Sequence, residues 1–181
     1  MTIGIILGST RGGRAGEAVA HWVADAAQNR EGFDYRLLDL KDFQLPLNES
    51  ETVPMAANKN YDSAEVTRWS EAIDACEAFV FVTPEYNHSV PAAFKNAVDS
   101  LGSEWAGKPV AFVGYGANGG VRAVEHWRQI TANFQMPNVR SQVAISIMTE
   151  FPEGRFTPAD FQAGSLSALF AELEALLTRL R

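Results

Sequence analysis

The chain has 181 residues, of which 46% are hydrophobic and 20% are charged, and its formal net charge at pH 7 is −7. This composition excludes a largely disordered chain, and the acidic balance disfavours a nucleic-acid-binding protein, which needs basic runs to neutralise phosphates. The single cysteine, Cys76, excludes an internal disulfide and a cysteine-rich metal site.

The length predicts one domain over residues 1–181. Residues 1–7 are apolar but have no basic leader and run directly into Gly8, which is typical of a first strand and not of a signal peptide. No apolar run approaches the ~20 residues needed to span a bilayer. We therefore expect a cytoplasmic protein with no nucleic-acid or membrane partner.

In the first half of the chain, residues 3–7 and 35–40 are predicted strands. The intervening helix should bury its apolar positions, which recur at i, i+3 and i+4: Ala15, Ala18, Val19, Trp22, Val23 and Ala26. Residues 41–60 are predicted to be irregular, and a loop of this length usually covers a site or meets a partner.

The second half alternates helices with strands. The predicted helices are residues 63–76, 92–101, 121–134 and 158–180, and the predicted strands are residues 78–82, 109–113 and 139–147. Five such alternations predict an α/β fold, with one parallel sheet covered by helices on both faces. The commonest topology is the flavodoxin-like three-layer sandwich, with strand order 2-1-3-4-5. In that order, the loops after strands one, three and four meet at one crevice.

The first of these loops, residues 8–17, predicts an anion site. Glycines allow close approach of backbone N–H groups, and the start of a helix adds unpaired donors and a positive dipole. Ser9 contributes a hydroxyl, and Arg11 and Arg14 contribute forked donors suited to phosphate oxygens. The predicted binding residues are Ser9, Arg11, Arg14, Ala15, Gly16 and Glu17.

Several ligands compete for this loop. A nucleoside triphosphate loop requires Lys-Ser/Thr after its second glycine, where this chain has Arg14-Ala15. A dinucleotide-binding turn requires a second glycine where this chain has Thr10. A terminal monophosphate fits best, and a plain glycine-rich turn with solvated arginines remains the alternative.

The loop after the third strand, residues 83–91, predicts a wall for a flat heterocycle. Pro84 lacks an N–H group and Tyr86 offers a ring, while the backbone N–H groups of residues 85–87 and the Asn87 amide suit ring carbonyls and nitrogens. The predicted contacts are Pro84, Glu85, Tyr86 and Asn87. The alternative is a simple turn bracketed by two prolines.

Residues 114–120, after the fourth strand, contain four glycines and predict a second wall packed against main chain. The predicted contacts are Gly114, Tyr115, Gly116 and Gly119. A flexible connection to the next helix is the alternative for this loop.

The remaining reactive side chains suggest structural roles. The three histidines have no metal-ligand spacing, and His21 and His126 are expected to be surface or cap residues. Cys76 is expected to lie in the core, and Lys95 to pair with Asp99 one helical turn away. We predict no metal site and no catalytic side chain.

Three segments resemble the NAD(P)H-dependent FMN reductase family, whose relatives include quinone, chromate and azo-dye reductases. They are Gly8-Ser9-Thr10-Arg11, Pro84-Glu85-Tyr86-Asn87-x-Ser89-x-Pro91-Ala92-x-x-Lys95-Asn96-Ala97-x-Asp99, and Gly107-Lys108-Pro109-Val110. The resemblance covers roughly residues 3–147, and the segment from Pro84 is its specific part.

The resemblance implies FMN as cofactor, with its phosphate on Ser9 and Arg11 and its ring against residues 84–87. It also implies NAD(P)H as co-substrate, a quinone, free flavin, azo compound or oxidised metal as electron acceptor, and a homodimer or tetramer. Many members have a serine where this chain has Ala15-Gly16, so Arg14 or backbone N–H groups would take its place. The alternatives are a flavodoxin-type electron carrier, a flavin-dependent sensor, and a dinucleotide-binding domain without flavin.

Overall fold

A computed structural model describes residues 1–180 and contains one parallel sheet. Its strands are β1 (Thr2–Leu7), β2 (Asp34–Asp39), β3 (Ala78–Pro84), β4 (Val110–Gly116) and β5 (Asn138–Ser146). They lie in the order β2-β1-β3-β4-β5, and every adjacent pair is parallel. This order confirms the predicted flavodoxin-like fold.

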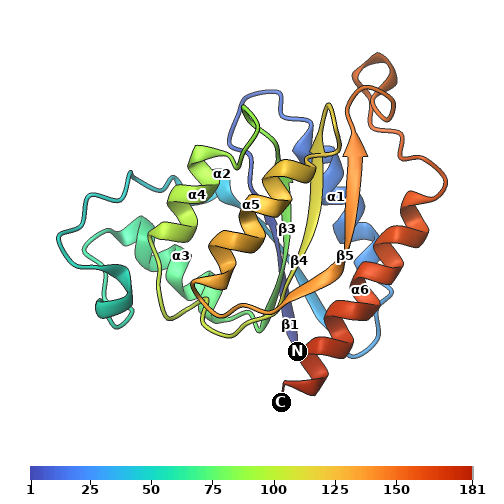
Figure 1. The fold of residues 1–181 in the computed structure, drawn as a ribbon. Helices are drawn as coiled ribbons and strands as arrows, with labels where there is room; N and C mark the ends of the chain where they lie inside the picture. Colours follow the sequence, from blue (N-terminus) through green and yellow to red (C-terminus); the bar gives the residue numbers. More distant parts are fainter. Residues whose placement is uncertain (181) are drawn as a thin grey trace.

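Helices cover both faces of the sheet (Figure 1). One face carries α1 (Gly16–Ala27) and α6 (Gln162–Arg179), and the other carries α3 (Ala64–Asp74), α4 (Ala92–Asp99) and α5 (Val121–Ala132). Three short elements lie in the loops: α2 (Leu40–Phe43), η1 (Pro54–Ala56) and η2 (Pro152–Gly154). None of the helices within residues 1–180 has the length and apolar character needed to cross a membrane.

The central strands are apolar because neither of their faces meets water. All seven residues of β3 and all seven of β4 are buried. On the side of α3, α4 and α5, the core is largely aromatic, and its buried polar atoms are paired: the Trp127 indole donates to Thr83 Oγ1 at 3.0 Å and the Trp69 indole donates to the Ala97 carbonyl at 2.8 Å. Cys76 is buried in this core as predicted, and burial raises the pKa of its thiol to about 11.

Several predicted details were wrong. Within the segment predicted to be irregular, the chain forms α2 and η1, and the last helix begins at Gln162 instead of residue 158. In α1, Ala18 and Ala26 are exposed, while Ala20 and Ala27 are buried with Val19 and Val23. Alanine is small enough to be accommodated on either side of a helix, so its spacing does not reveal the buried face.

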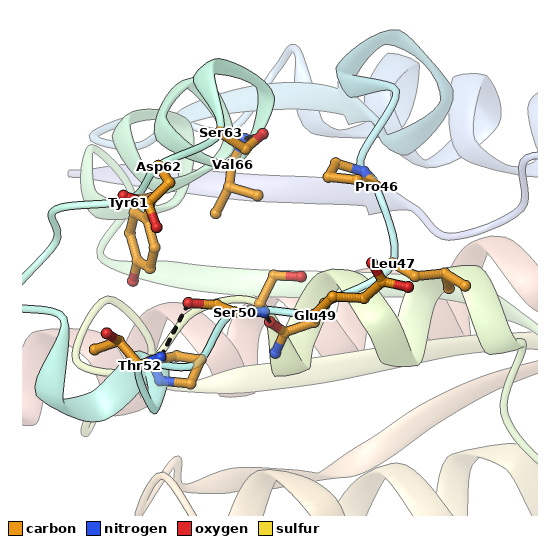
Figure 2. Close-up of a pocket in the computed structure, with 12 residues that line it drawn as sticks. Pro46, Leu47, Glu49, Ser50, Thr52, Tyr61, Asp62, Ser63 and Val66 are labelled. Atoms are coloured by element: carbon orange, nitrogen blue, oxygen red, sulfur yellow. Dashed lines mark hydrogen bonds between the residues drawn. The ribbon is translucent and has the colours of Figure 1, made fainter.

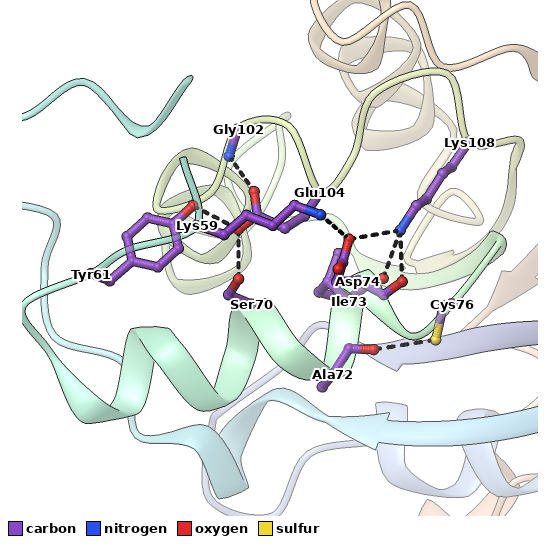
Figure 3. Close-up of polar contacts among 10 residues, drawn as sticks. All are labelled: Lys59, Tyr61, Ser70, Ala72, Ile73, Asp74, Cys76, Gly102, Glu104 and Lys108. Carbon is purple, nitrogen blue, oxygen red and sulfur yellow. Dashed lines mark hydrogen bonds and ion pairs between the residues drawn. The ribbon is translucent and has the colours of Figure 1, made fainter. Parts of the chain in front are cut away.

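The buried carboxylate of Glu104 joins three segments of the helical layer formed by α3, α4 and α5 (Figure 3). It accepts hydrogen bonds from the Tyr61 hydroxyl at 2.7 Å, the Ser70 hydroxyl at 2.6 Å and the Gly102 backbone N–H at 3.1 Å. Three donors replace the water that a buried carboxylate has lost. Glu104 therefore fixes the end of the 44–62 loop to α3 and to the turn after α4.

An ion pair fixes the first loop to the end of β2. The Arg14 guanidinium binds both carboxylate oxygens of Asp39 and donates to the Ser9 carbonyl at 2.6 Å. Only 7% of the Arg14 side chain is exposed, and the hydrogen bond to Asp39 raises the pKa of Arg14 despite partial burial. By contrast, both side chains of the Arg36–Asp34 ion pair on β2 are more than half exposed.

We predict that Glu104→Ala lowers the free energy of unfolding by about 2–4 kcal/mol, since it leaves buried donors without an acceptor. Urea denaturation followed by circular dichroism measures this loss. The control is Glu49→Ala, which removes an exposed carboxylate from the 44–62 loop. It should change the free energy of unfolding by less than about 0.5 kcal/mol. Equal effects of the two substitutions would show that Glu104 has no special role.

Asp39→Ala should cost about 2–4 kcal/mol of stability, because it leaves the Arg14 charge largely buried without its partner. Asp34→Ala is the matched control on β2 and should cost less than about 1 kcal/mol, as is usual for an exposed ion pair. The same denaturation experiment compares the two. A loss for Asp39→Ala no larger than that for Asp34→Ala would contradict the importance of the buried pair.

Candidate functional site

A cavity of about 260 Å³ opens at the carboxyl edge of the sheet, where the loops after β1, β3 and β4 meet. Parallel α/β sheets bind ligands at this edge, beside the strand where the order reverses. The lining residues are Ser9, Arg11, Gly13, Arg14, Ala15, Pro84, Glu85, Tyr86, Tyr115, Gly116 and Ile147. The structure thus brings together residues from all three loops that the sequence predicted.

Gly8 and Ser9 hold the first loop against α4, β3 and the loop after β3. A Cβ on Gly8 would lie 2.0 Å from a ring carbon of Phe94, so only glycine allows this approach, and the Gly8 N–H donates to the Val82 carbonyl at 3.0 Å. The buried Ser9 hydroxyl lies 2.8 Å from the Tyr86 hydroxyl. This contact joins the first loop to the loop after β3.

The two arginines of the first loop have different roles. The Arg11 guanidinium lies over the Tyr86 ring at 5.6 Å from its centroid and is exposed, and it has no carboxylate partner within the part of the chain that the structure describes. Arg14 is instead neutralised by Asp39 and also lies 3.7 Å from Glu17. Arg11 therefore offers a free positive charge at the cavity, and Arg14 shapes the loop.

The start of α1 supplies backbone donors. Ala15 occupies the N-cap position, and no side chain caps this end of the helix. Its first turn carries Glu17, whose exposed side chain points to Arg14 and does not line the cavity. The uncapped N–H groups and the helix dipole favour an anion here.

The hydroxyl of Tyr115 adds an independent sign of a ligand at this position. Tyr115 is 5% exposed, and its hydroxyl oxygen is buried with no hydrogen-bond partner among residues 1–180. A buried hydroxyl without a partner is uncommon in folded proteins. A phosphate group with acceptor oxygens fits a site that holds this donor, an uncapped helix start and Arg11.

The loop after β3 contains a tight turn. Tyr86 and Ser89 exchange backbone hydrogen bonds of 3.0 and 3.1 Å, and Asn87 and His88 between them have φ values of 48° and 73°. Two positive φ values between paired residues indicate a type I′ turn, and asparagine and histidine tolerate this conformation better than most residues.

This turn corrects one expectation. The backbone N–H of Glu85 donates to the Tyr115 carbonyl at 3.1 Å, and that of Tyr86 donates within the turn. Of residues 85–87, only Asn87 keeps a backbone N–H and a side-chain amide without a partner in the described chain. Pairing between β3 and β4 continues further than the sequence suggested, and it takes up the other two donors.

Helix α5 supports the same loop through two contacts that the sequence did not predict. The Glu85 carboxylate accepts from the Arg122 backbone N–H at 3.1 Å and from the Arg122 guanidinium at 2.6 Å. The Ser89 hydroxyl lies 2.8 Å from His126 Nδ1. His126 is therefore a contact of the site loop instead of a surface or cap residue, and only the tertiary packing of α5 on β3 reveals it.

The structure places the predicted residues of the 114–120 segment in two different environments. Gly114–Gly116 belong to β4, and only Tyr115 and Gly116 line the cavity. A Cβ on Gly114 would lie 2.7 Å from the Gly119 carbonyl oxygen, and one on Gly119 would lie 2.9 Å from the Ala144 Cβ. These two glycines allow the chain to pack on itself, so they do not face the cavity.

The sequence analysis also missed Ile147, which follows β5, lines the cavity and is 40% exposed. Its backbone N–H donates to the Gly116 carbonyl at 3.0 Å, which holds it beside the wall formed by β4. The position of Ile147 was predictable from the sequence, because β5 ends at the same edge of the sheet as the other strands.

A second cavity, of about 180 Å³, lies under the 46–54 loop beside α3 (Figure 2). Its lining includes the carboxylic residues Glu49 and Asp62 and no lysine or arginine. Hydrogen bonds such as that from the Thr52 N–H to Ser50 Oγ at 3.2 Å organise its rim. This cavity has no cation for a phosphate, so the site at the carboxyl edge remains the candidate.

Known proteins are similar to this chain in sequence and in fold. The chain is 42% identical over 125 residues to an NAD(P)H-dependent FMN reductase of a Nectria species, a match that covers 67% of this chain and 62% of that relative. It is 33% identical over 142 residues to a 2-hydroxy-1,4-benzoquinone reductase of a Burkholderia species, covering 73% and 70% of the two chains.

Among solved structures, the NAD(P)H:acceptor oxidoreductase FerB of Paracoccus denitrificans has a similar fold, with a TM-score of 0.73, 24% identity, and coverage of 96% of this chain and 97% of that one. The sequence model of the NADPH-dependent FMN reductase family matches residues 1–150. This match confirms the resemblance and the predicted cofactors, FMN with NAD(P)H. The chain belongs to the NADPH-dependent FMN reductase family.

Proposed function

We propose that this protein is an FMN-dependent NAD(P)H oxidoreductase whose electron acceptor is a quinone, free flavin, azo compound or oxidised metal. The observation that carries the proposal is the convergence, at one cavity, of an uncapped helix start, an unpaired arginine and a buried hydroxyl without a partner. These groups suit the phosphate of FMN, and the Tyr86 ring and β4 backbone beside them suit a flat ring.

In this proposal, Ser9, Arg11 and the backbone N–H groups of Ala15 and Gly16 hold the phosphate, while the Glu17 N–H donates to the Arg14 carbonyl at 3.4 Å. Arg14 positions the loop through Asp39 and does not contact the cofactor. Pro84, Tyr86 and Gly116, which line the cavity, form the ring wall. Asn87 does not line the cavity itself, and its unpaired backbone N–H and amide contact the ring edge from the neighbouring turn. Glu85 supports the wall through Arg122.

Bound at this cavity, FMN would supply the chemistry, namely hydride acceptance from NAD(P)H and electron transfer to the acceptor. The chain's part is to bind, orient and exclude water. No side chain at the cavity needs to act as an acid or base, since the Glu85 carboxylate is neutralised by Arg122 and the Tyr115 hydroxyl stays protonated because burial raises its pKa. Ile147 adds an apolar surface that favours a flat, apolar acceptor such as a quinone.

We also propose a homodimer, or a tetramer, in the cytoplasm, with residues 1–181 as one domain. Three large apolar residues of the 44–62 loop, Leu47, Val53 and Met55, are 74%, 67% and 50% exposed, which supports burial of this loop by a partner copy. Multi-angle light scattering during gel filtration measures the mass, and a monomer would contradict the proposal.

We expect purified protein to be yellow or to take up FMN, and NADPH or NADH to bleach the bound flavin without oxygen. Absorbance near 450 nm measures both steps. Protein that binds no FMN would refute every flavin-based function. Protein that binds FMN but is never bleached would instead be an electron carrier or sensor. A panel of quinones, flavins, azo dyes and chromate then ranks the acceptors.

Arg11→Ala should weaken FMN binding about tenfold or more, because a charged contact to the phosphate is lost, and should leave riboflavin binding nearly unchanged. Flavin fluorescence titration of apoprotein compares the two ligands. Arg179→Ala, which removes a positive charge from the last turn of α6, is the matched control. An equal loss for FMN and riboflavin would place the phosphate elsewhere.

A further inference from the structure

The buried hydroxyl of Tyr115 has no role in the fold. Every hydrogen bond described for Tyr115 in residues 1–180 involves its backbone, and its hydroxyl has no partner. A buried hydroxyl that lost its water without gaining another partner destabilises the protein. Such a group is expected where a ligand completes the hydrogen bond.

The position of this hydroxyl is set by Gly16. A Cβ built on Gly16 would lie 2.0 Å from the Tyr115 hydroxyl oxygen and 2.6 Å from the ring carbon that carries it. The hydroxyl therefore occupies the space that a side chain at residue 16 would fill, on the first turn of α1. Although Tyr115 comes from β4, it delivers its polar atom to the uncapped helix start.

The polar groups around the hydroxyl include the Ser9 hydroxyl and two guanidiniums. Burial raises the pKa of Tyr115, and the nearby Ser9 hydroxyl and the Arg14 and Arg11 guanidiniums only partly offset this effect, so the phenol is protonated at physiological pH. Arginine donates hydrogen bonds and cannot accept them, and the Ser9 hydroxyl is paired with that of Tyr86. Within residues 1–180, no group is placed to form a hydrogen bond with the Tyr115 hydroxyl.

We propose that the Tyr115 hydroxyl donates a hydrogen bond to the terminal phosphate of FMN. A phosphate has only acceptor oxygens near neutral pH, so it supplies a partner for the unpaired Tyr115 O–H. This inference rests on the proposed function and extends it: β4 contributes to the phosphate site as well as to the ring wall. Gly16 is required because it makes room for the hydroxyl.

Tyr115→Phe removes the hydroxyl and keeps the ring. We expect it to weaken FMN binding about 10- to 100-fold, the usual result of losing a hydrogen bond to a charged group, and to change riboflavin binding by less than about twofold. Fluorescence titration of apoprotein measures both affinities. The control is Tyr35→Phe on β2. It removes a hydroxyl that donates to Glu174 and should change neither affinity.

A second variant separates the hydroxyl from the rest of the side chain. In Tyr115→Ala protein, which has no ring beside residue 16, Gly16→Ser restores a hydroxyl on the first turn of α1, and the double variant should bind FMN more tightly than Tyr115→Ala alone. Gly16→Ser alone should lose FMN affinity, because its Cβ would collide with Tyr115. Circular dichroism checks that each variant is folded.

Several outcomes overturn the proposal. Unchanged FMN binding by Tyr115→Phe would show that the hydroxyl is not a ligand, and an equal loss of FMN and riboflavin would assign Tyr115 to the ring. A double variant that binds FMN no more tightly than Tyr115→Ala would contradict the inferred position. If the wild-type protein binds neither flavin, the proposed function itself fails, whereas wild-type binding with unaffected variants refutes only the role of Tyr115.

Discussion

The pairing of β1 with both β2 and β3 is the constraint on which the site depends. Since β1 pairs with β2 on one side and β3 on the other, the connections that leave β1 and β3 run to opposite faces of the sheet, through α1 and α4. The loops that follow the two strands therefore separate at the carboxyl edge and leave space between them. The cavity lies at this point.

Internal contacts then fix the walls of that space. The Arg14–Asp39 pair ties the first loop to β2, the Ser9–Tyr86 contact ties it to the loop after β3, and Glu85–Arg122 ties that loop to α5. Each contact joins segments far apart in the sequence. A site held in this way loses little entropy when a cofactor binds, which suits a protein whose task is to position a reactive cofactor.

The order of the strands, their parallel direction and the three loops that meet were all predictable from the alternation of apolar runs with amphipathic segments. Individual contacts at the site were less predictable. Arg14 was expected to bind phosphate, yet the structure pairs it with Asp39. Gly114 and Gly119 were expected to face a ligand, yet they pack against neighbouring backbone and Ala144. A residue type shows what a side chain is able to bind, but not which of several partners lies within reach.

The sequence by itself determined the flavodoxin-like fold and the family, because both depend on local periodicity and on short motifs whose residues are adjacent in the chain. Only the tertiary structure decided which donors are free and which are used. It paired the Glu85 and Tyr86 N–H groups, placed His126 beside Ser89, and brought the Tyr115 hydroxyl to the space left by Gly16. The physical reason is that a hydrogen bond depends on distances of about 3 Å between segments whose separation in the sequence carries no such information.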